Sequence, residues 1–357
     1  MNIIEIFNAK AVATQWNEVA SNKVPYLGKG FFPNRKKMGL DLGWIKGLKG
    51  LPISLAPTNF DAKSTLRSRE GFEMINNEMA FFRESMLVKE ADEQEIMRVQ
   101  SANDAYANEV LARIYDDVNT LLDGAEVVPE RMRMQLLCPE NEGHPMIVIE
   151  SKGVKYAYNY DTDGSYAENN YKALVGATDM WTDHANSKPL KDIETALDAI
   201  EEATGNRPAI ALMNSVTFNH LKENESIRSA ILAQNATANI MMTNARVKEL
   251  ISTELGVTPI IYNKMYKDEA GVAHKFFADG FCTLLPEGAL GSTWYGVTPE
   301  ERTLQGSSEV ESVQLIDNAI AVVVKITEDP VNTKTTVSEI VLPSYERMGE
   351  TYVIKAF

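Results

Sequence analysis

The apolar positions between residues 91 and 123 repeat at the spacing of an α-helix. They lie three, four or seven residues apart and are Ile96, Val99, Tyr106, Val110, Ile114, Val118 and Leu121. Acidic residues stand at the beginning of this stretch and Gly124 follows its end, as is typical of helix termini. The pattern predicts a helix over 91–123, about 50 Å long, which exceeds the usual helix of a compact domain. We interpret it as a structural rod.

Shorter helices are predicted further along the chain from their capping residues. One helix begins at Pro189 and stops at Gly205. A second begins after Asn214, and a third covers 244–255 between Thr243 as N-cap and a glycine at 256.

Alternating and short apolar runs predict strands elsewhere. A hairpin is expected from 145–150 and 154–160 around the Ser-Lys-Gly turn at 151–153. The other expected strands cover 209–213, 258–262, 275–277, 281–285, 313–326 and 337–342. Helices and strands without a regular βαβ repeat indicate an α+β chain, not a doubly wound nucleotide-binding fold.

Glycine and proline interrupt the segment from 25 to 57 at short intervals, which excludes a long helix there. Apolar residues between them, including Trp44, are too many for an ordinary linker and too interrupted for a core. The segment 79–88 has aromatic and aliphatic residues and is expected to return beside the first as a long two-stranded ribbon. Such a ribbon is marginal in water, so we expect sister molecules, not the monomer core, to cover Trp44, Phe81 and Phe82.

The composition is that of a folded protein in water. Hydrophobic residues make up 44% and charged residues 24%, the mean hydropathy is -0.22, and the net charge is -15. These values exclude wholesale disorder and a membrane-embedded body, and the negative net charge disfavours nucleic-acid binding over the whole molecular surface. The sequence shows neither a secretory leader nor a membrane span.

The charge is unevenly distributed. Residues 1–70 contain 11 Lys and Arg against 5 Asp and Glu, which gives +6 and leaves -21 for the remainder. A cationic arm beside an anionic body favours self-association, because the arm is attracted to neighbouring copies as well as to its own body. A solvated basic tail and a nucleic-acid patch are the alternative interpretations of the same charges.

Catalytic and cofactor motifs are missing from the sequence. Cys138 and Cys282 have no paired spacing, and no phosphate-binding loop, HExxH, GxSxG or CxxC motif is present. The four histidines are scattered, so no catalytic base, cofactor or metal ligand is assigned. Residues 159–164 approach a calcium loop, but its twelfth position is Asn170, where a bidentate Glu is required. We interpret Asp163-Gly164 as turn chemistry.

Several phrases resemble the tailed-phage major capsid proteins, specifically the relatives of the phage lambda major capsid protein, the capsid E family. The phrases are Met38-Gly-Leu-Asp-Leu-Gly-Trp-Ile-Lys-Gly-Leu-Lys-Gly50, Ser68-Arg-Glu-Gly-Phe72, Met79-Ala-Phe-Phe-Arg-Glu84, Asp92-Glu-Gln-Glu-Ile96, Pro189-Leu-Lys-Asp-Ile193, Thr204-Gly205, Met213-Asn214, Thr217-Phe218, Gly296-Val-Thr-Pro-Glu-Glu301, Asp329-Pro-Val-Asn332 and Pro343-Ser-Tyr-Glu346. Their joint order carries the resemblance, which extends over nearly the whole chain.

The resemblance implies the Hong Kong 97-type capsid fold. It places an N-terminal arm at 1–38, an extended loop (E-loop) at 39–89, and a peripheral domain at 90–205 that contains the spine helix 91–123. An axial domain follows at 206–317, and residues 318–357 return to the peripheral domain. The inter-subunit assembly residues expected from the arm and E-loop are Arg35, Leu42, Trp44, Leu51, Phe60, Arg67, Arg69, Phe81, Phe82 and Arg83.

The implied function is structural: self-assembly into pentamers and hexamers of an icosahedral phage or prophage head that encloses double-stranded DNA. The implied partners are sister subunits, portal and scaffolding proteins and a decoration protein, with DNA enclosed without sequence-specific binding. The implied location is the virion capsid, assembled in the host bacterial cytoplasm. Three alternatives remain open here: a bacterial nanocompartment shell of the same fold, a hydrolase assembled from distant His, Asp and Ser residues, and an acidic binding module.

Overall fold

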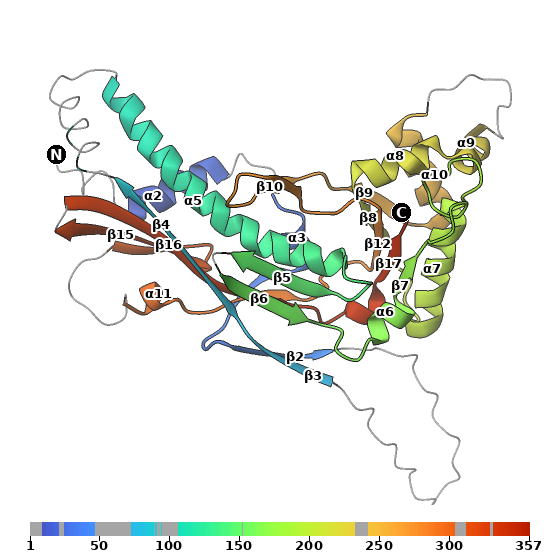
Figure 1. Cartoon of the computed structure of the whole chain (residues 1–357), viewed down its shortest axis with the longest axis horizontal. Helices are drawn as coiled ribbons and strands as arrows, with labels where there is room; N and C mark the ends of the chain where they lie inside the picture. The colour runs from blue at the N-terminus through green and yellow to red at the C-terminus, as the bar shows by residue number, and fades with distance from the viewer. Residues whose placement is uncertain are drawn as a thin grey trace, which may run out of the picture. The chain divides into compact units, whose positions relative to one another are not determined.

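The computed structural model describes residues 9–20, 25–46, 73–88, 90, 94, 106–151, 153–232, 242–303, 312–328 and 331–357 (Figure 1). The chain forms two units whose segments alternate along the sequence. The first unit takes residues 1–42, 77–132 and 292–344, and the second takes 43–76, 133–291 and 345–357. Each unit has its own larger sheet and its own buried residues, so each is described separately.

The longest helix, α5 (Tyr106–Leu137), confirms that a long helix follows the ribbon segment but corrects where it ends. Gly124 does not end the helix, and Pro129 also lies inside it. Glycine costs about 1 kcal/mol and proline about 3 kcal/mol inside a helix. The last turns bury the side chains of Met132, Met134, Leu136 and Leu137. Burying each such side chain gains about 1.5–3 kcal/mol, which offsets both costs. In the first part of the predicted helix, Gln94 is helical, as is Glu90 just before it. Residues 91–93 and 95–105 lie outside the described residues.

The first unit is built on a six-stranded sheet in the order β1-β13-β16-β15-β14, with β4 paired to β16. The strands are β1 (Asn34–Lys36), β13 (Ser292–Tyr295), β16 (Val331–Ser344), β15 (Ile320–Glu328), β14 (Ser312–Ile316) and β4 (Ala80–Val88). All pairs are antiparallel except β1 with β13. The helices α2 (Ala9–Ala20), α3 (Gly28–Phe31) and α11 (Pro299–Thr303) belong to the same unit.

The ribbon prediction is wrong in its pairing. The stretch 79–88 forms β4, which runs along β16 from Ala80 opposite Val341 to Val88 opposite Thr333. The strand that pairs with β2 (Asp41–Lys46) is instead β3 (Glu73–Glu78). The sequence pattern identified an extended apolar strand, but strand propensity carries no information about which of two distant partners it joins.

The stretch 313–326 is a hairpin and not the single strand that was predicted. Strands β14 and β15 pair with Ser312 opposite Val324 and Ile316 opposite Ile320. Asp317 and Asn318 form the turn with φ of 51° and 55°. The backbone N–H of Ala319 donates to the Ile316 carbonyl at 2.9 Å, so residues 317–319 form a tight turn between the strands. Asp and Asn tolerate positive φ better than most residues. This Asp-Asn pair was the local signal that the strand prediction overlooked.

The second unit is built on a five-stranded sheet in the order β7-β17-β12-β8-β9. Its strands are β7 (Tyr171–Ala173), β17 (Tyr352–Lys355), β12 (Phe281–Leu285), β8 (Ile210–Met213) and β9 (Thr258–Ile261). Its helices are α6 (Ser165–Asn169), α7 (Pro189–Thr204), α8 (Ser215–Glu223), α9 (Glu225–Leu232), α10 (Asn244–Leu255) and the 3₁₀ turn η1 (Met348–Glu350). Two hairpins, β5 (Met146–Ser151) with β6 (Val154–Asn159) and β10 (Met265–Lys267) with β11 (Ala273–Lys275), belong to the same unit.

The cap residues confirm the helices predicted in this unit. The Asn214 side chain accepts a hydrogen bond from the backbone N–H of Thr217, and Thr243 accepts one from Arg246. Gly205 and Gly256 end α7 and α10 with φ of 75° and 69°, as left-handed C-caps require. The hairpin predicted around 151–153 is also confirmed, whereas the strand expected at 275–277 lies two residues earlier, as β11.

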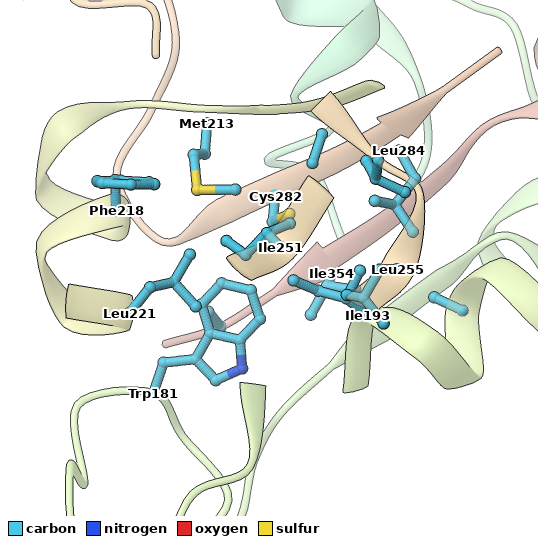
Figure 2. Close-up of a cluster of buried hydrophobic side chains, with 14 of the residues drawn as sticks. Trp181, Ile193, Met213, Phe218, Leu221, Ile251, Leu255, Cys282, Leu284 and Ile354 are labelled. Carbon is cyan, nitrogen blue, oxygen red and sulfur yellow. The ribbon is translucent and has the colours of Figure 1, made fainter. Parts of the chain in front are cut away.

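The core of the second unit lies where α7, α8 and α10 pack beside the five-stranded sheet (Figure 2). Trp181, Leu197, Phe218 and Ile251 are completely buried there, and Cys282 of β12 lies among them. The Trp181 indole donates a hydrogen bond to an Asp192 carboxylate oxygen at 3.1 Å, so its polar atom is satisfied at the edge of the core. The cluster is otherwise apolar, which makes hydrophobic burial the main stabilising contribution to this unit.

Candidate assembly surfaces

Strands β2 and β3 are the ends of the segment predicted to reach neighbouring subunits. Trp44 on β2 is 5% exposed, and its ring lies 5.1 Å from the ring of Tyr160, at the end of the β5–β6 hairpin. Leu42 and Ile75 are buried as well. The expectation that only sister molecules cover Trp44 is therefore wrong, because Tyr160 of the same chain packs against it.

The other predicted assembly residues divide into two groups. Leu51, Phe60, Arg67 and Arg69 lie outside the described residues. Phe81 and Phe82 are half-buried on β4, and Arg83 beside them is exposed. Arg35 is exposed on β1, with its guanidinium 5.7 Å from the centre of the Trp294 ring. The described members of this set thus lie on β1, β2 and β4 and do not form one cluster.

Two neighbouring carboxylates on α11 form ion pairs with basic residues on β4 and β1. A Glu300 oxygen lies 2.5 Å from Arg83 Nη2, and Glu301 Oε1 lies 2.5 Å from Lys36 Nζ. Both glutamates belong to the phrase 296–301 that carried part of the family resemblance, but no role was predicted for them. Lys36 and Glu301 are 265 residues apart in sequence, so local sequence patterns give no sign of the contact.

The described part of the N-terminal arm packs on the first unit of its own chain. Phe31 and Phe32 are buried, and the backbone N–H of Gly28 donates a hydrogen bond to Glu130 of α5 at 3.1 Å. Burial raises the pKa of Tyr26 to about 12, with smaller contributions from nearby carboxylates, Glu126 first among them. Residues 25–36 are therefore part of the folded body of the subunit.

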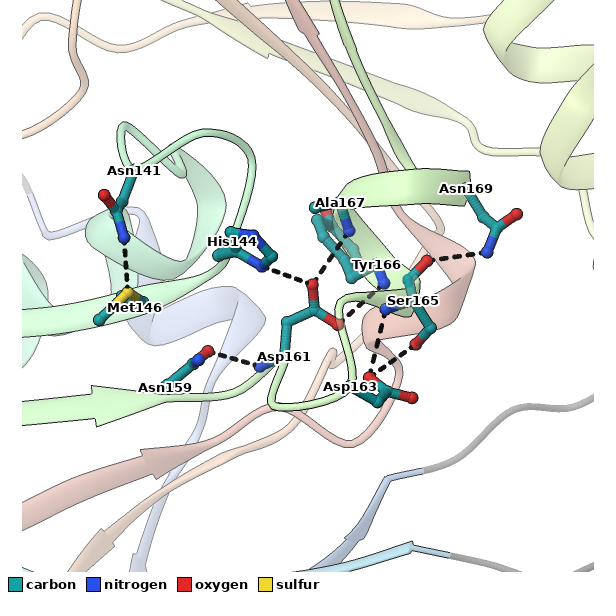
Figure 3. Close-up of polar contacts among 10 residues, drawn as sticks. All are labelled: Asn141, His144, Met146, Asn159, Asp161, Asp163, Ser165, Tyr166, Ala167 and Asn169. Atoms are coloured by element: carbon teal, nitrogen blue, oxygen red, sulfur yellow. Dashed lines mark hydrogen bonds and ion pairs between the residues drawn. The ribbon is translucent and has the colours of Figure 1, made fainter.

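The segment that resembles a calcium loop is a turn held together by its own side chains (Figure 3). Asp161 is 1% exposed, and its carboxylate accepts hydrogen bonds from the backbone N–H groups of Tyr166 and Ala167. One of its oxygens also lies 2.9 Å from His144 Nδ1. Asp163 accepts hydrogen bonds from the N–H and hydroxyl of Ser165. These contacts use the carboxylates to begin helix α6, in agreement with the turn interpretation.

The sequence of the chain matches one protein family over almost its whole length. The sequence model of the family described as phage major capsid protein E matches residues 8–356. The chain belongs to the phage major capsid protein E family. It is a structural capsid protein, its fold is the Hong Kong 97-type fold that was predicted, and its place is the virion capsid. Neither the nanocompartment shell nor the hydrolase is favoured by this match.

Solved structures show the same fold at low sequence identity. The capsid protein is similar to a candidate prophage capsid protein of E. coli CFT073, with a TM-score of 0.59 and 15% identity over 98% of this chain and 99% of that one. A phage-related protein of Bordetella bronchiseptica RB50 gives a TM-score of 0.56 and 16% identity over 97% of this chain and 96% of that one. The capsid of cyanophage A-1(L) gives a TM-score of 0.50 and 10% identity over 94% and 93%. No curated protein sequence matches the chain.

The titratable groups of the described residues include two buried thiols and a pair of histidines. Among the described residues, no group of three His, Cys, Asp or Glu side chains is placed to hold a metal ion. Burial raises the pKa of the Cys282 thiol to about 12, and that of Cys138 is also well above its usual value. His184 Nε2 lies 2.9 Å from His220 Nδ1, and burial lowers the pKa of His220. In the part of the chain that the structure describes, no helix is long and apolar enough to cross a membrane.

Proposed function

We propose that this capsid protein assembles into pentamers and hexamers of an icosahedral head that encloses double-stranded DNA. The observation that carries the proposal is the pairing of β2 with β3 as a two-stranded sheet separate from the two larger sheets. Two strands alone are marginal in water, and the pair lies at the two ends of the predicted E-loop. A loop of this kind gains stability when a neighbouring subunit covers it.

The division into parts follows the prediction from sequence. We assign residues 1–38 to the arm, 39–89 to the E-loop, 90–205 and 318–357 to the peripheral domain, and 206–317 to the axial domain. Within this scheme the described assembly residues are Arg35, Phe81, Phe82 and Arg83, whereas Leu42 and Trp44 are already buried within the subunit. Leu51, Phe60, Arg67 and Arg69 keep the same proposed role on sequence grounds alone.

The proposed partners are sister subunits first, then portal, scaffolding and decoration proteins. Packaged DNA is enclosed without sequence-specific contacts, because a chain with a net charge of -15 repels phosphate on average. No enzymatic reaction is proposed for the chain.

Electron microscopy and ultracentrifugation of the purified full chain test this proposal. We expect shells, rings or capsomers in negative stain and a matching high sedimentation coefficient. A concentrated native preparation that remains strictly monomeric would contradict the proposal.

Ionic strength provides a second test of how the subunits attract one another. A basic N-terminal part and an acidic remainder attract across subunits at low salt, and salt screens this attraction beyond about 10 Å at 0.1 M. We therefore expect light scattering from assembling protein to change between low and high salt. Identical assembly at all salt concentrations would remove the electrostatic part of the proposal.

Side-chain truncation tests the assembly residues on β4. Phe81→Ala and Phe82→Ala are expected to leave the subunit soluble and to lower the yield of shells, because both rings are only half-buried in the chain itself. Leu221→Ala in the completely buried core of the second unit is the matched variant, and it is expected to lower the yield of soluble protein first.

A further inference from the structure

Helix α11 presents two consecutive carboxylates to two chain segments that are far apart in sequence. Glu301 Oε1 contacts Lys36 Nζ of β1 at 2.5 Å, and Glu300 Oε1 contacts Arg83 Nη2 of β4 at 2.5 Å. Lys36 precedes β2 by five residues and Arg83 follows β3 by five residues. One short helix thus binds the chain just before the paired strands begin and just after they end.

These ion pairs are more protected from water than ordinary surface pairs. The side chains of Glu300 and Glu301 are only 14% and 11% exposed, against 45% for Arg83 and 28% for Lys36. Within the described residues, Glu301 Oε2 is buried and has no hydrogen-bond partner, so Lys36 compensates a carboxylate that water does not fully solvate. Removing a partner of a partly buried ion pair has a larger effect than removing one of an exposed pair.

The carboxylates are themselves held in place. The Ser338 hydroxyl of β16 donates a hydrogen bond to the second oxygen of Glu300 at 2.7 Å. The backbone N–H of Glu301 donates to the hydroxyl of Thr298, which is completely buried. The Arg83 guanidinium also lies 4.8 Å from the centre of the Phe81 ring, which restricts its position. The contacts therefore join fixed groups on the sheet of the first unit.

We propose that Glu300 and Glu301 are positioning residues for assembly: they hold Lys36 and Arg83, so that the two chain segments flanking the β2–β3 pair are fixed to the first unit. The proposal rests on the proposed function, in which that pair lies at the base of a loop that contacts neighbouring subunits. Fixing both ends restricts the loop before it meets a neighbour, which reduces the conformational entropy lost on association. Arg83 then acts by positioning the chain within its own subunit.

The test compares Glu300→Gln, Glu301→Gln and the double variant with the wild-type full chain. We expect the variants to remain folded and the unfolding midpoint in urea to fall only modestly, because each change removes one charge of a partly buried ion pair. We expect amide hydrogen exchange to increase in 73–88, and the yield of shells in gradient sedimentation to fall at least tenfold. Glu254→Gln, an exposed change on α10, is the control and is expected to behave as wild type.

A double-mutant cycle with Arg83→Gln separates positioning from a general loss of charge. If the Glu300–Arg83 contact carries the effect, Glu300→Gln with Arg83→Gln lowers shell yield no further than either single change. Additive losses, or wild-type yield and exchange in Glu300→Gln, would overturn the proposal. Wild-type protein that forms no shells would contradict the proposed function. In that case the exchange measurement still tests the positioning role, because wild-type hydrogen exchange of 73–88 in the glutamate variants would rule it out.

Discussion

The two units differ in whether a buried threonine hydroxyl of the sheet is hydrogen-bonded. In the second unit the residues between the helices and the sheet are almost all apolar, and the completely buried Thr283 hydroxyl donates to the Leu137 carbonyl at 2.6 Å. In the first unit, β16 buries Thr335 at 1% exposure, and its hydroxyl has no hydrogen-bond partner among the described residues. Both units therefore bury polar groups, but Thr283 and Asp161 of the second unit are hydrogen-bonded, whereas the Thr335 hydroxyl of the first is buried at a cost in free energy.

This difference indicates how the two parts respond to change. An apolar core tolerates changes of charge at its surface and is sensitive to lost volume. A sheet that is joined by charged contacts between distant segments is more sensitive to changes of charge and hydrogen bonding. The predictions below test this contrast by free energies of unfolding.

The largest effect is expected from a cavity in the second unit. Leu197→Ala removes a completely buried side chain of α7 and is expected to lower the free energy of unfolding by about 2–5 kcal/mol. Urea denaturation followed by circular dichroism measures the change. Thr195→Ala on the exposed side of the same helix is the control. A loss below about 1 kcal/mol for Leu197→Ala would mean that this core is not the main source of stability.

The elements of this core were predictable from sequence because their signals are local. The N-caps Asn214 and Thr243 directly precede the helices α8 and α10 that they begin, and the glycines directly follow the helices α7 and α10 that they end. In the first unit, by contrast, the sequence identified 79–88 as a strand but not β16 as its partner, about 250 residues away in sequence. Pairing between distant segments depends on packing, which the local pattern does not contain.

The next largest effect is expected at the turn before α6. Asp161→Ala removes a buried carboxylate that accepts hydrogen bonds from Tyr166 and Ala167, and it is expected to cost about 2–3 kcal/mol. Asp163→Ala, which loses contacts that are exposed, is the matched control and is expected to cost less than about 1 kcal/mol. Equal losses in the two variants would show that burial does not distinguish them.

The candidate assembly surface was less predictable than this turn. The turn chemistry of Asp163-Gly164 could be recognised within a few residues, because Asp hydrogen-bonds to the backbone two residues on. The partners of Arg83 and Lys36 lie more than 200 residues away on α11, so their contacts could not be derived from spacing. The burial of Trp44 was also missed, since its neighbour Tyr160 follows in a different hairpin.

A matched pair of threonine substitutions compares the two sheets directly. Thr283→Val removes a satisfied buried hydroxyl and is expected to lower the free energy of unfolding by about 1 kcal/mol. Thr335→Val removes a buried hydroxyl without a partner among the described residues and is expected to raise it by about 1 kcal/mol. Denaturation of both variants under the same conditions measures the difference. The same sign in both would contradict the contrast between the units.

The smallest effect is expected from pH acting on His220. Burial and the neighbouring His184 lower the pKa of His220 in the folded chain, while Glu223 acts in the opposite direction and the Phe357 ring lies 5.0 Å away. A lowered folded-state pKa means that the unfolded chain binds the proton more readily, so this stabilising contribution is complete above about pH 6.5 and is lost as the pH falls through the folded pKa. The free energy of unfolding of the wild type should therefore decrease from pH 8 to pH 5 more than that of His220→Gln. If His220→Gln keeps the wild-type slope, the pH dependence arises elsewhere in the chain, and the histidine pair contributes to the second unit by packing alone.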